Sequence, residues 1–486
     1  MVIWLGVFLA LALFLRVGFS MDASFDDDAG RYLYSGNDPY YHDRTVTHMV
    51  ETGESLTFDP AINYPNGAYN PNPPLFDWTT ALDAGLLSTM GSEDAVGLAL
   101  NLSVAFWGAL TVIPIYLLGA DLFNRRAGLW GAFFMAVSAP HIQRSVFGFA
   151  DHDATTMFFI ALAFVFLVKA LKSLDNRTHV RKWNDANLRM EGIKASLAAN
   201  KVALLWAALA GTALSATALT WKGYPYALGV MAFALGIQLL LDHQRHKDSV
   251  SLFAVYLIPV FMVTLIPLPW YATVGFLDNT ILAGIYVLVG MIIAGAILIP
   301  TRDLPSVVVF PALAGAALLS LLVMLLLVPT IGQTIFTGLG YFEQTKLYST
   351  IAEAQRTEIG FVVANMGFFS FFLGLWGLFR AMKLGWKGDQ AMLLMASWGI
   401  VAIFMALAAS RFVFNAAPVF AILAGGMTMV VLGAMGLDEV RQRYRRRYGQ
   451  GNVVSNGILS MTWKATTGVF LVAVLLVIPN AWFGVD

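Results

Sequence analysis

Residues 149–155 read Phe-Ala-Asp-His-Asp-Ala-Thr and stand between two long apolar runs, 127–147 and 154–173. Runs of this length are typical of helices that span a lipid bilayer. Two carboxylates and an imidazole at a membrane edge cost free energy unless a cation or a basic partner compensates them. Asp-x-Asp can offer two oxygen ligands to one hard divalent metal. The alternative is structural, because Asp is also a favoured N-cap, here for a helix that begins near Ala154.

The composition places the whole chain in the membrane class. Hydrophobic residues make up 58% of the chain and charged residues 12%, and the mean hydropathy is +0.69. The pattern predicts an all-α polytopic membrane protein with about thirteen transmembrane helices. The apolar runs lie near residues 1–20, 96–120, 127–147, 154–173, 202–221, 224–241, 250–268, 280–299, 305–328, 361–379, 390–409, 412–436 and 464–481.

Charge and cysteine content exclude several classes of function. The formal net charge is +0, so no overall electrostatic attraction to nucleic acid is expected. The chain has no cysteine, which excludes disulfides, thiol chemistry and cysteine metal sites. Because no small-residue cleavage site precedes a soluble domain, the first apolar run is expected to be a span rather than a signal peptide.

Lysines and arginines are sorted to one side of the predicted membrane. They gather after even-numbered spans, as in Arg125–Arg126, residues 169–194 and residues 441–447. Basic loops face the cytoplasm, so a multi-pass protein of the cell membrane is predicted, with its N-terminus inside and its C-terminus outside. The first external loop (21–95) and the fifth external loop (329–360) then face outward. A connection as long as the first is unusual and indicates function.

Three separate outward-facing segments carry acidic residues. Asp38 lies in the first external loop before a proline, Asp151 and Asp153 lie before the fourth span, and Glu353 lies in the fifth external loop. Each alone has an ordinary explanation as a turn residue or a solvated acid. Together, at the mouths of helices on one face, three sources of carboxylate are enough for a Mg²⁺ or Mn²⁺ site.

Two arginines and a tryptophan are expected near the same face. Arg144 precedes the Asp turn, Arg411 lies between the eleventh and twelfth spans, and Trp221 lies between the fifth and sixth. Arginines at helix ends often snorkel, and tryptophan is common in interfacial belts. A planar guanidinium also grips phosphate. A metal with arginines at an external membrane edge suits a lipid-linked phosphate as the substrate, and the active site is expected on the external face.

These motifs, in this order, resemble those of the catalytic subunit of oligosaccharyltransferase in its single-subunit archaeal form. The matching stretches are 36–38 (Gly-Asn-Asp), 148–153 (Gly-Phe-Ala-Asp-His-Asp) after Arg144, 350–353 (Thr-Ile-Ala-Glu) and Arg411-Phe412. The thirteen-span layout also agrees. The resemblance implies a GT-C type membrane glycosyltransferase in which residues 1–486 form the transmembrane catalytic domain.

The resemblance also implies a reaction and roles for residues. An oligosaccharide would pass from a dolichyl or polyprenyl phosphate carrier to the Asn of an Asn-x-Ser/Thr sequon in an acceptor polypeptide, which is N-glycosylation of secreted proteins. The implied catalytic residues are Asp38, Asp151 and Glu353. The implied ligands of a Mn²⁺ or Mg²⁺ cofactor are Asp38, Asp151 and Asp153. The implied substrate contacts are Arg144, His152, Trp221, Glu353 and Arg411.

The sequence departs from the family in one respect. The family carries a C-terminal soluble domain with a Trp-Trp-Asp-Tyr-Gly motif that reads the Ser/Thr of the sequon, and this motif does not occur in the sequence. We therefore expect either a truncated chain or a short relative that needs a partner for sequon recognition.

Two other functions remain open from the sequence. Another GT-C membrane glycosyltransferase, such as a protein O-mannosyltransferase or a lipid-sugar-using transferase, would also place an acidic motif in its first external loop. Residues 350–353 favour the N-linked reaction. A secondary transporter would place polar groups near the bilayer midplane, whereas these acids lie at one predicted surface.

Overall fold

A computed structural model describes residues 1–175, 177–275, 281–327, 354–447 and 453–483 of the chain. In this part the chain is almost entirely helical, with two short antiparallel hairpins. The same residues include 10 helices that are long and apolar enough to cross a membrane, together with shorter apolar helices at 283–298 and 306–319. In the described part of the chain the predicted apolar runs fall mainly on helices, so the predicted all-α polytopic class is confirmed.

The first half of the chain is mainly helical. Its α-helices are α1 (Val2–Val17), α2 (Asp38–Thr52), α3 (Leu75–Thr89), α4 (Ala95–Leu110), α5 (Val112–Leu122), α6 (Arg125–Ala136), α7 (Ala139–Ile142), α8 (Asp153–Lys172), α9 (Ala186–Ala199), α10 (Lys201–Ala218) and α11 (Pro225–Gln244). A short 3-10 helix, η1, covers Asp22–Ser24.

The second half of the chain is also mainly helical. Its helices are α12 (Val250–Leu265), α13 (Leu268–Thr273), α14 (Leu282–Leu298), α15 (Ser306–Leu327), α17 (Ile359–Met366), α18 (Phe368–Trp386), α19 (Gln390–Ala408), η5 (Ser410–Phe412), α20 (Val413–Ala434), α21 (Leu437–Arg447), α22 (Val453–Ser460), α23 (Trp463–Val472), a π-helical segment η6 (Ala473–Val477) and α24 (Ile478–Phe483).

The predicted third span, residues 127–147, is shorter and broken in the structure. α6 ends at Ala136, and only the four-residue α7 follows. Pro140 explains the break, because proline has no amide hydrogen to donate to the Ala136 carbonyl and its ring clashes with that carbonyl in a continuous helix. The chain from α7 to α8 is consequently non-helical, and this stretch carries the Asp-x-Asp motif.

The first predicted external loop has a structure of its own. β1 (Phe25–Asp26) pairs with β2 (Arg31–Tyr32), β3 (Phe58–Asp59) pairs with β4 (Ala68–Tyr69), and α3 packs against α2 and α4. A small buried apolar cluster includes Tyr34, Val46, Phe76, Leu100 and Ala150. Because Ala150 belongs to this cluster, the loop is packed directly against the stretch that carries the Asp-x-Asp motif.

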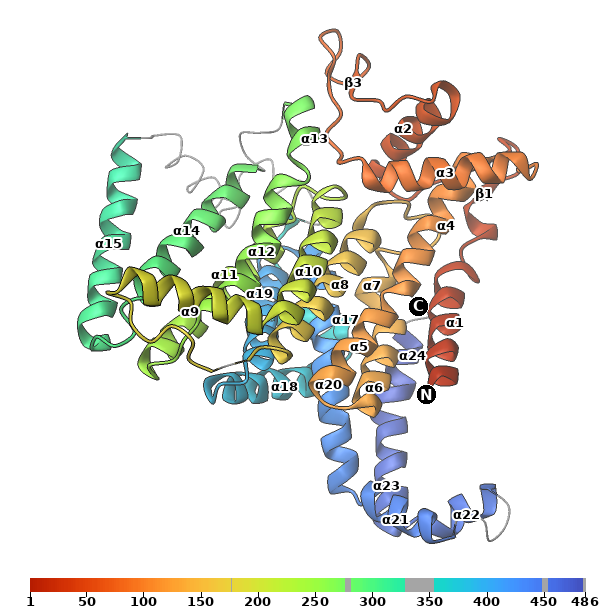
Figure 1. The fold of residues 1–486 in the computed structure, drawn as a ribbon. Helices are drawn as coiled ribbons and strands as arrows, with labels where there is room; N and C mark the ends of the chain where they lie inside the picture. Colours follow the sequence, from red (N-terminus) through yellow and green to blue (C-terminus); the bar gives the residue numbers. More distant parts are fainter. Residues whose placement is uncertain (176, 276–280, 328–353, 448–452, 484–486) are drawn as a thin grey trace.

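The two ends of the helical bundle carry different segments. α2, α3 and the hairpins lie at one end, and α21 and α22 lie at the other (Figure 1). We call these the α2–α3 end and the α21 end. Between them, α8, α10 and α12 pack together, as do α6, α18 and α20. This arrangement agrees with the predicted alternation, in which residues 21–95 and 441–447 lie on opposite sides of the membrane.

Candidate functional site

A backbone hydrogen bond joins the two acidic motifs that are far apart in sequence. The Ser35 N–H donates to the Gly148 carbonyl at 2.7 Å, and the Gly148 N–H donates to Asn101 Oδ1 at 2.7 Å. Gly148 has φ +100°, a conformation that side chains disfavour. Asn101 is fully buried on α4. The start of α2 and the chain before α8 are therefore held side by side.

Two histidines and an aspartate form the centre of the site. Asp151 Oδ1 lies 2.6 Å from His152 Nδ1 and 3.4 Å from His42 Nε2, and the two imidazoles approach to 3.3 Å. Asp151 and His42 are buried, while His152 is partly buried. We call His42, Asp151 and His152 the His–Asp group. Its potential ligand atoms lie within 4.8 Å of one another.

Asp77 orients the His42 ring from the opposite side. His42 Nδ1 lies 2.6 Å from Asp77 Oδ1, and both side chains are almost completely buried. An ionised carboxylate only accepts hydrogen bonds, so Nδ1 carries the proton and donates it. In neutral His42 the lone pair then belongs to Nε2, which faces Asp151. A carboxylate behind an imidazole is the usual partner that fixes a metal-binding histidine.

Charge compensation inside the group shifts its pKa values. Burial disfavours charged His42, but the carboxylates of Asp77 and Asp151 outweigh burial and raise the pKa of His42 to about 10. Burial likewise opposes ionised Asp151, yet His152 and His42 hold the pKa of its carboxyl well below the usual range. Protons on the imidazoles therefore offset the carboxylate charge, and metal binding at such a group releases protons.

Asp153 is compensated by two arginines as well as by His152. Arg144 Nη1 lies 3.5 Å from Asp153 Oδ2, and the Arg144 guanidinium stands 5.1 Å from the centre of the Phe149 ring. The positive charge of Arg411, in η5 between α19 and α20, also acts on Asp153. The structure thus brings together five of the predicted site residues or their charges: Asp151, His152, Asp153, Arg144 and Arg411.

Of the remaining predicted residues, Asp38 and Trp221 lie in the part of the chain that the structure describes. Asp38 is the first residue of α2, is exposed, and precedes His42 by one helical turn on the same face. Trp221 is partly buried in the turn between α10 and α11, and the neighbouring Leu219 carbonyl accepts a hydrogen bond from Leu75 N–H at the start of α3. Glu353 lies outside the residues that the structure describes.

The predicted metal ligands are not gathered as three carboxylates. In the described ranges, three potential metal ligands come within 4.8 Å of one another in the His–Asp group. Asp38 and Asp153 do not belong to this group. The physical reason is repulsion between buried carboxylates, which is avoided when each has its own cationic partner. Asp151 has the two histidines, Asp153 has Arg144, and Asp38 stays in solvent.

The His–Asp group nevertheless fits a divalent cation. His152 Nε2 and Asp77 Oδ2 are buried without a hydrogen-bond partner in the described part of the chain. Asp151 offers a carboxylate oxygen and His42 offers Nε2. A mixed nitrogen and oxygen set suits Zn²⁺ or Mn²⁺ better than Mg²⁺, which prefers oxygen ligands.

A buried arginine anchors the chain that carries the site. Arg16 on α1 is fully buried, and its Nε donates to Ser145 Oγ at 2.7 Å while Nη2 lies 2.9 Å from His141 Nδ1. The Arg16 carbonyl also accepts a hydrogen bond from Phe147 N–H at 2.8 Å. These bonds fix the non-helical stretch on both sides of Arg144.

The sequence did not reveal the residues that hold the side chains and backbone of the site in place. His42 and Asp77 form an ion pair at 2.6 Å, as close as that of His152 and Asp151, and Arg16 and Asn101 position the backbone of the site. One signal was available for His42, because it lies four residues after Asp38 and hence on the same helical face. Nothing in the sequence alone pointed to Asp77, whose partner is 35 residues away.

Comparison with known proteins identifies the family. A family model described as "Oligosaccharyl transferase STT3, N-terminal" matches residues 7–478. The chain belongs to the STT3 oligosaccharyl transferase family. The predicted resemblance is therefore confirmed. A curated STT3-type relative, dolichyl-monophosphooligosaccharide–protein glycotransferase AglB of Haloferax volcanii, is 29% identical over 375 residues, which cover 71% of this chain and 34% of the relative.

Solved structures agree with the STT3 assignment at the level of the fold. Archaeal oligosaccharyltransferase AglB from Archaeoglobus fulgidus, in complex with an inhibitory peptide and a dolichol-phosphate, matches with TM-score 0.78 and 19% identity over 99% of this chain and 55% of that chain. A complex of the Archaeoglobus fulgidus oligosaccharyltransferase with Zn and sulfate matches with TM-score 0.66 and 18% identity over 99% and 52% of the two chains. This chain thus spans about a third to about half of the length of these proteins.

Proposed function

We propose that this chain carries the membrane-embedded active site of an oligosaccharyltransferase. The reaction would transfer an oligosaccharide from a dolichyl or polyprenyl phosphate carrier to the Asn of an Asn-x-Ser/Thr sequon in an acceptor polypeptide. The observation that carries the proposal is the joining of the first and second acidic motifs by the Ser35–Gly148 hydrogen bond, next to Arg144. STT3 family membership supports it, and the active site would face outward from the cell membrane.

The acceptor group is an amide, so the site has to make an amide nitrogen more nucleophilic. An amide nitrogen is a poor nucleophile because its lone pair is delocalised into the carbonyl group. In the reaction a bond forms between this nitrogen and the sugar C1, the bond from C1 to the carrier phosphate oxygen breaks, and the nitrogen loses a proton. Carboxylates that accept hydrogen bonds from the amide N–H groups weaken the delocalisation. We assign this role to Asp38 and Glu353.

The carrier phosphate would be held by the cationic residues beside Asp153. Arg144 and Arg411 present planar guanidinium groups, which bind phosphate oxygens in pairs. Trp221, in the turn beside the start of α3, would contact the lipid end of the carrier. His152 would complete the contacts on the phosphate side. Negative charge develops on the departing phosphate, so fixed positive groups at this place stabilise the transition state.

A divalent cation is proposed as the cofactor. His42, Asp151 and His152 would hold it, with Asp38 and Asp153 as the further ligands expected from the family resemblance. A bound cation supplies Lewis-acid stabilisation of charge on the leaving phosphate. Asp77 fixes the proton of His42 on Nδ1 and so keeps Nε2 available. Zinc in the related Archaeoglobus structure supports a cation in this fold, and Mn²⁺ or Mg²⁺ is the expectation from the sequence.

A transfer assay tests the reaction. The full chain, purified in detergent, would be supplied with dolichyl-phosphate-linked oligosaccharide, Mn²⁺ and a fluorescent peptide that contains Asn-x-Thr. We expect Asp151→Asn to lower the transfer rate by roughly 100-fold or more, because it removes preorganised charge at the reacting centre. Asp28→Asn, which makes the same chemical change at an exposed acid of the first external loop, is the control.

The assay also separates the rival functions. Transfer that is unchanged in both Asp38→Ala and Asp151→Ala would refute the assignment of the acids. Glycan found on Ser or Thr of the peptide would identify an O-linked transferase. Uptake of substrate into vesicles by wild-type protein that shows no transfer would identify a transporter.

Cation binding is tested without the reaction. Titration of Mn²⁺ into the full chain, followed by the loss of its free-ion electron paramagnetic resonance signal, gives the affinity directly. We expect Asp151→Asn to abolish binding and Asp77→Asn to weaken it by roughly 10–100-fold, as for other residues that orient a ligand. Equal affinity in wild type and Asp77→Asn would show that His42 is not a ligand.

A further inference from the structure

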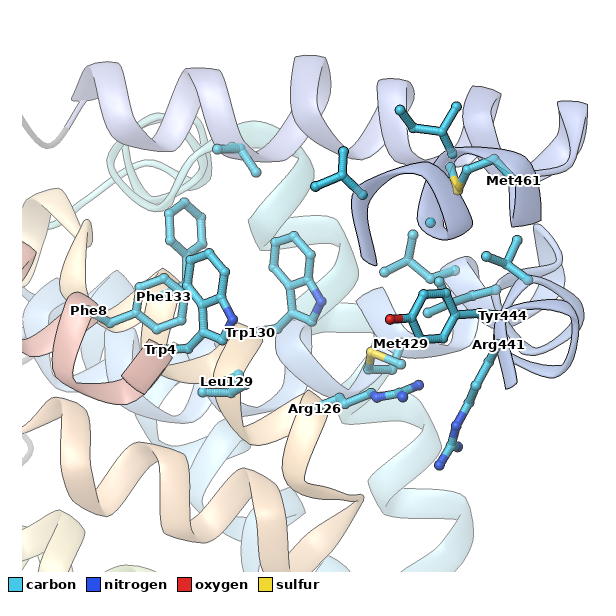
Figure 2. A pocket seen from close by; sticks show the side chains of 17 residues that line it. Trp4, Phe8, Arg126, Leu129, Trp130, Phe133, Met429, Arg441, Tyr444 and Met461 are labelled. Atoms are coloured by element: carbon cyan, nitrogen blue, oxygen red, sulfur yellow. The ribbon is translucent and has the colours of Figure 1, made fainter. Parts of the chain in front are cut away.

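A large apolar cavity lies far from the proposed active site, at the α21 end of the bundle. Its volume is about 930 Å³, within the usual range for sites that bind small molecules. Residues from α1, α6, α20, α21 and α22 line it (Figure 2). The cavity is open outward, because the lining residues Trp4 and Ile458 are 58% and 68% exposed.

The lining of the cavity is mainly apolar and includes two arginines. Figure 2 shows the aromatic side chains of Trp4, Trp130 and Phe133 together at one side, and Arg126 and Arg441 at the other. Arg126 is the second residue of α6, in the segment that separates the predicted second and third spans. Neither arginine has an ion pair with the residues that the structure describes.

The sequence of α21 explains how a strongly basic helix lines an apolar cavity. The residues of α21 that line it are Leu437, Val440, Arg441 and Tyr444. These positions have the spacing i, i+3, i+4 and i+7, which places them on one face of the helix. The other arginines of α21 are not among the lining residues, and Arg443 pairs with Glu439 at 2.7 Å. Arg441 is thus the α21 arginine assigned to the cavity.

We propose that this cavity binds an anionic phospholipid of the membrane leaflet on the α21 side. The apolar walls between spans would accept acyl chains, and Arg126 and Arg441 would bind the phosphate head group. The α21 end also carries the arginine-rich loop that the sequence predicts to be cytoplasmic. Basic pockets between spans on that side are suited to anionic lipid head groups. A soluble anion would leave the apolar walls exposed, which favours a lipid as the occupant.

The proposal is independent of the proposed transferase function. The cavity lies at the α21 end, whereas the His–Asp group lies at the α2–α3 end, so no residue belongs to both sites. A failure of lipid binding would therefore leave the transfer reaction untouched, and the reverse also holds.

Native mass spectrometry of the full chain in non-ionic detergent tests the proposal. Phosphatidylglycerol and phosphatidylcholine with identical acyl chains are the probes. We expect wild type to retain phosphatidylglycerol preferentially and Arg126→Gln/Arg441→Gln to lose roughly thirtyfold in affinity for it, about fivefold for each arginine. The matched control Arg443→Gln/Arg445→Gln removes the same charge from α21 outside the cavity and should bind as wild type does.

A second measurement locates the lipid. Phosphatidylglycerol with a photoreactive group in its acyl chain should label the cavity wall at Met429 or Met461, and excess inorganic phosphate should not prevent labelling. Equal retention of the two lipids by wild type would overturn the proposal. So would an equal loss in both double variants, which would indicate attraction to the charge of α21 as a whole. Displacement by inorganic phosphate alone would identify a soluble anion site instead.

Discussion

Replacing Gly148 by alanine should loosen the hydrogen bond that joins the two acidic motifs. Gly148 has φ +100°, and a Cβ there would lie 2.9 Å from Ser24 Oγ, closer than an ordinary contact. Its carbonyl accepts from Ser35 N–H, and its own N–H donates to Asn101. A change of backbone conformation at this one residue therefore disturbs both bonds, and with them the place of Asp151.

The expected loss of local stability in Gly148→Ala has two separate contributions. A side chain in a left-handed or otherwise unfavourable conformation costs about 1–3 kcal/mol. The contact with Ser24 adds to this, and Ser24→Ala removes it, because the next Ser24 atom is 3.9 Å away. We expect Gly148→Ala to destabilise the local structure by about 2 kcal/mol or more, with part of the loss recovered in Gly148→Ala/Ser24→Ala. A double-mutant cycle that includes Ser24→Ala alone isolates the contact.

Hydrogen exchange at the Ser35 amide is the assay closest to the expected change. A local loss of about 2 kcal/mol accelerates exchange roughly thirtyfold when the amide exchanges by local opening. Gly53→Ala is the control, because Gly53 has φ +75° but open space around it. It should leave the Ser35 amide as slow as in wild type. If Gly148→Ala also leaves the exchange of Ser35 and the transfer rate unchanged, the motifs are not held together by this bond.

Two further changes test how the loop and the bundle are held together. Asp59 accepts from Arg44 Nε at 2.7 Å and from Nη2 at 2.9 Å, and Arg44 lowers the pKa of Asp59 below 3.8. The stability that the Arg44–Asp59 ion pair gives the loop is present above pH 3.8 and is lost as the pH falls below 3.8. Proteolysis of the loop should therefore increase below pH 3.8 in wild type, and it should be high at every pH in Asp59→Asn. Tyr226→Phe leaves the buried Trp398 Nε1–H without its 2.9 Å acceptor and should cost about 1 kcal/mol, measured as a lower thermal midpoint in detergent; an equal or higher midpoint would contradict this.

The fold was predictable because each span that crosses the bilayer needs a long apolar run of its own. Long apolar runs appear in the sequence whatever their neighbours are, and the sorting of arginines such as Arg126 and Arg441 gives the alternation. The break of the third run was missed, since an average over 127–147 hides the effect of Pro140. The helices of the first external loop were also less visible, because α2 and α3 gain their stability from packing against α4 and Ala150.

Site residues were predictable only at positions where a residue and its immediate sequence neighbours are informative by themselves. Asp151, Asp153 and Arg144 are charged groups beside apolar runs, and that position alone is informative. The partners of these residues depend on how the loop folds back over the bundle. Asp77 lies beside His42 only because α3 packs against α2, and no local pattern records that pairing. Glu353 lies outside the described residues, so its role remains a prediction.

The contacts of the His–Asp group have a consequence for how the protein is made. His42, Asp77, Asp151 and His152, with the supporting Asn101, all precede residue 154 of the 486. A ribosome adds about 5–20 residues each second, so these segments emerge well before the later spans exist. The N-terminal helices can consequently begin to assemble this group during synthesis, and the remaining spans are added to a centre that is already taking shape.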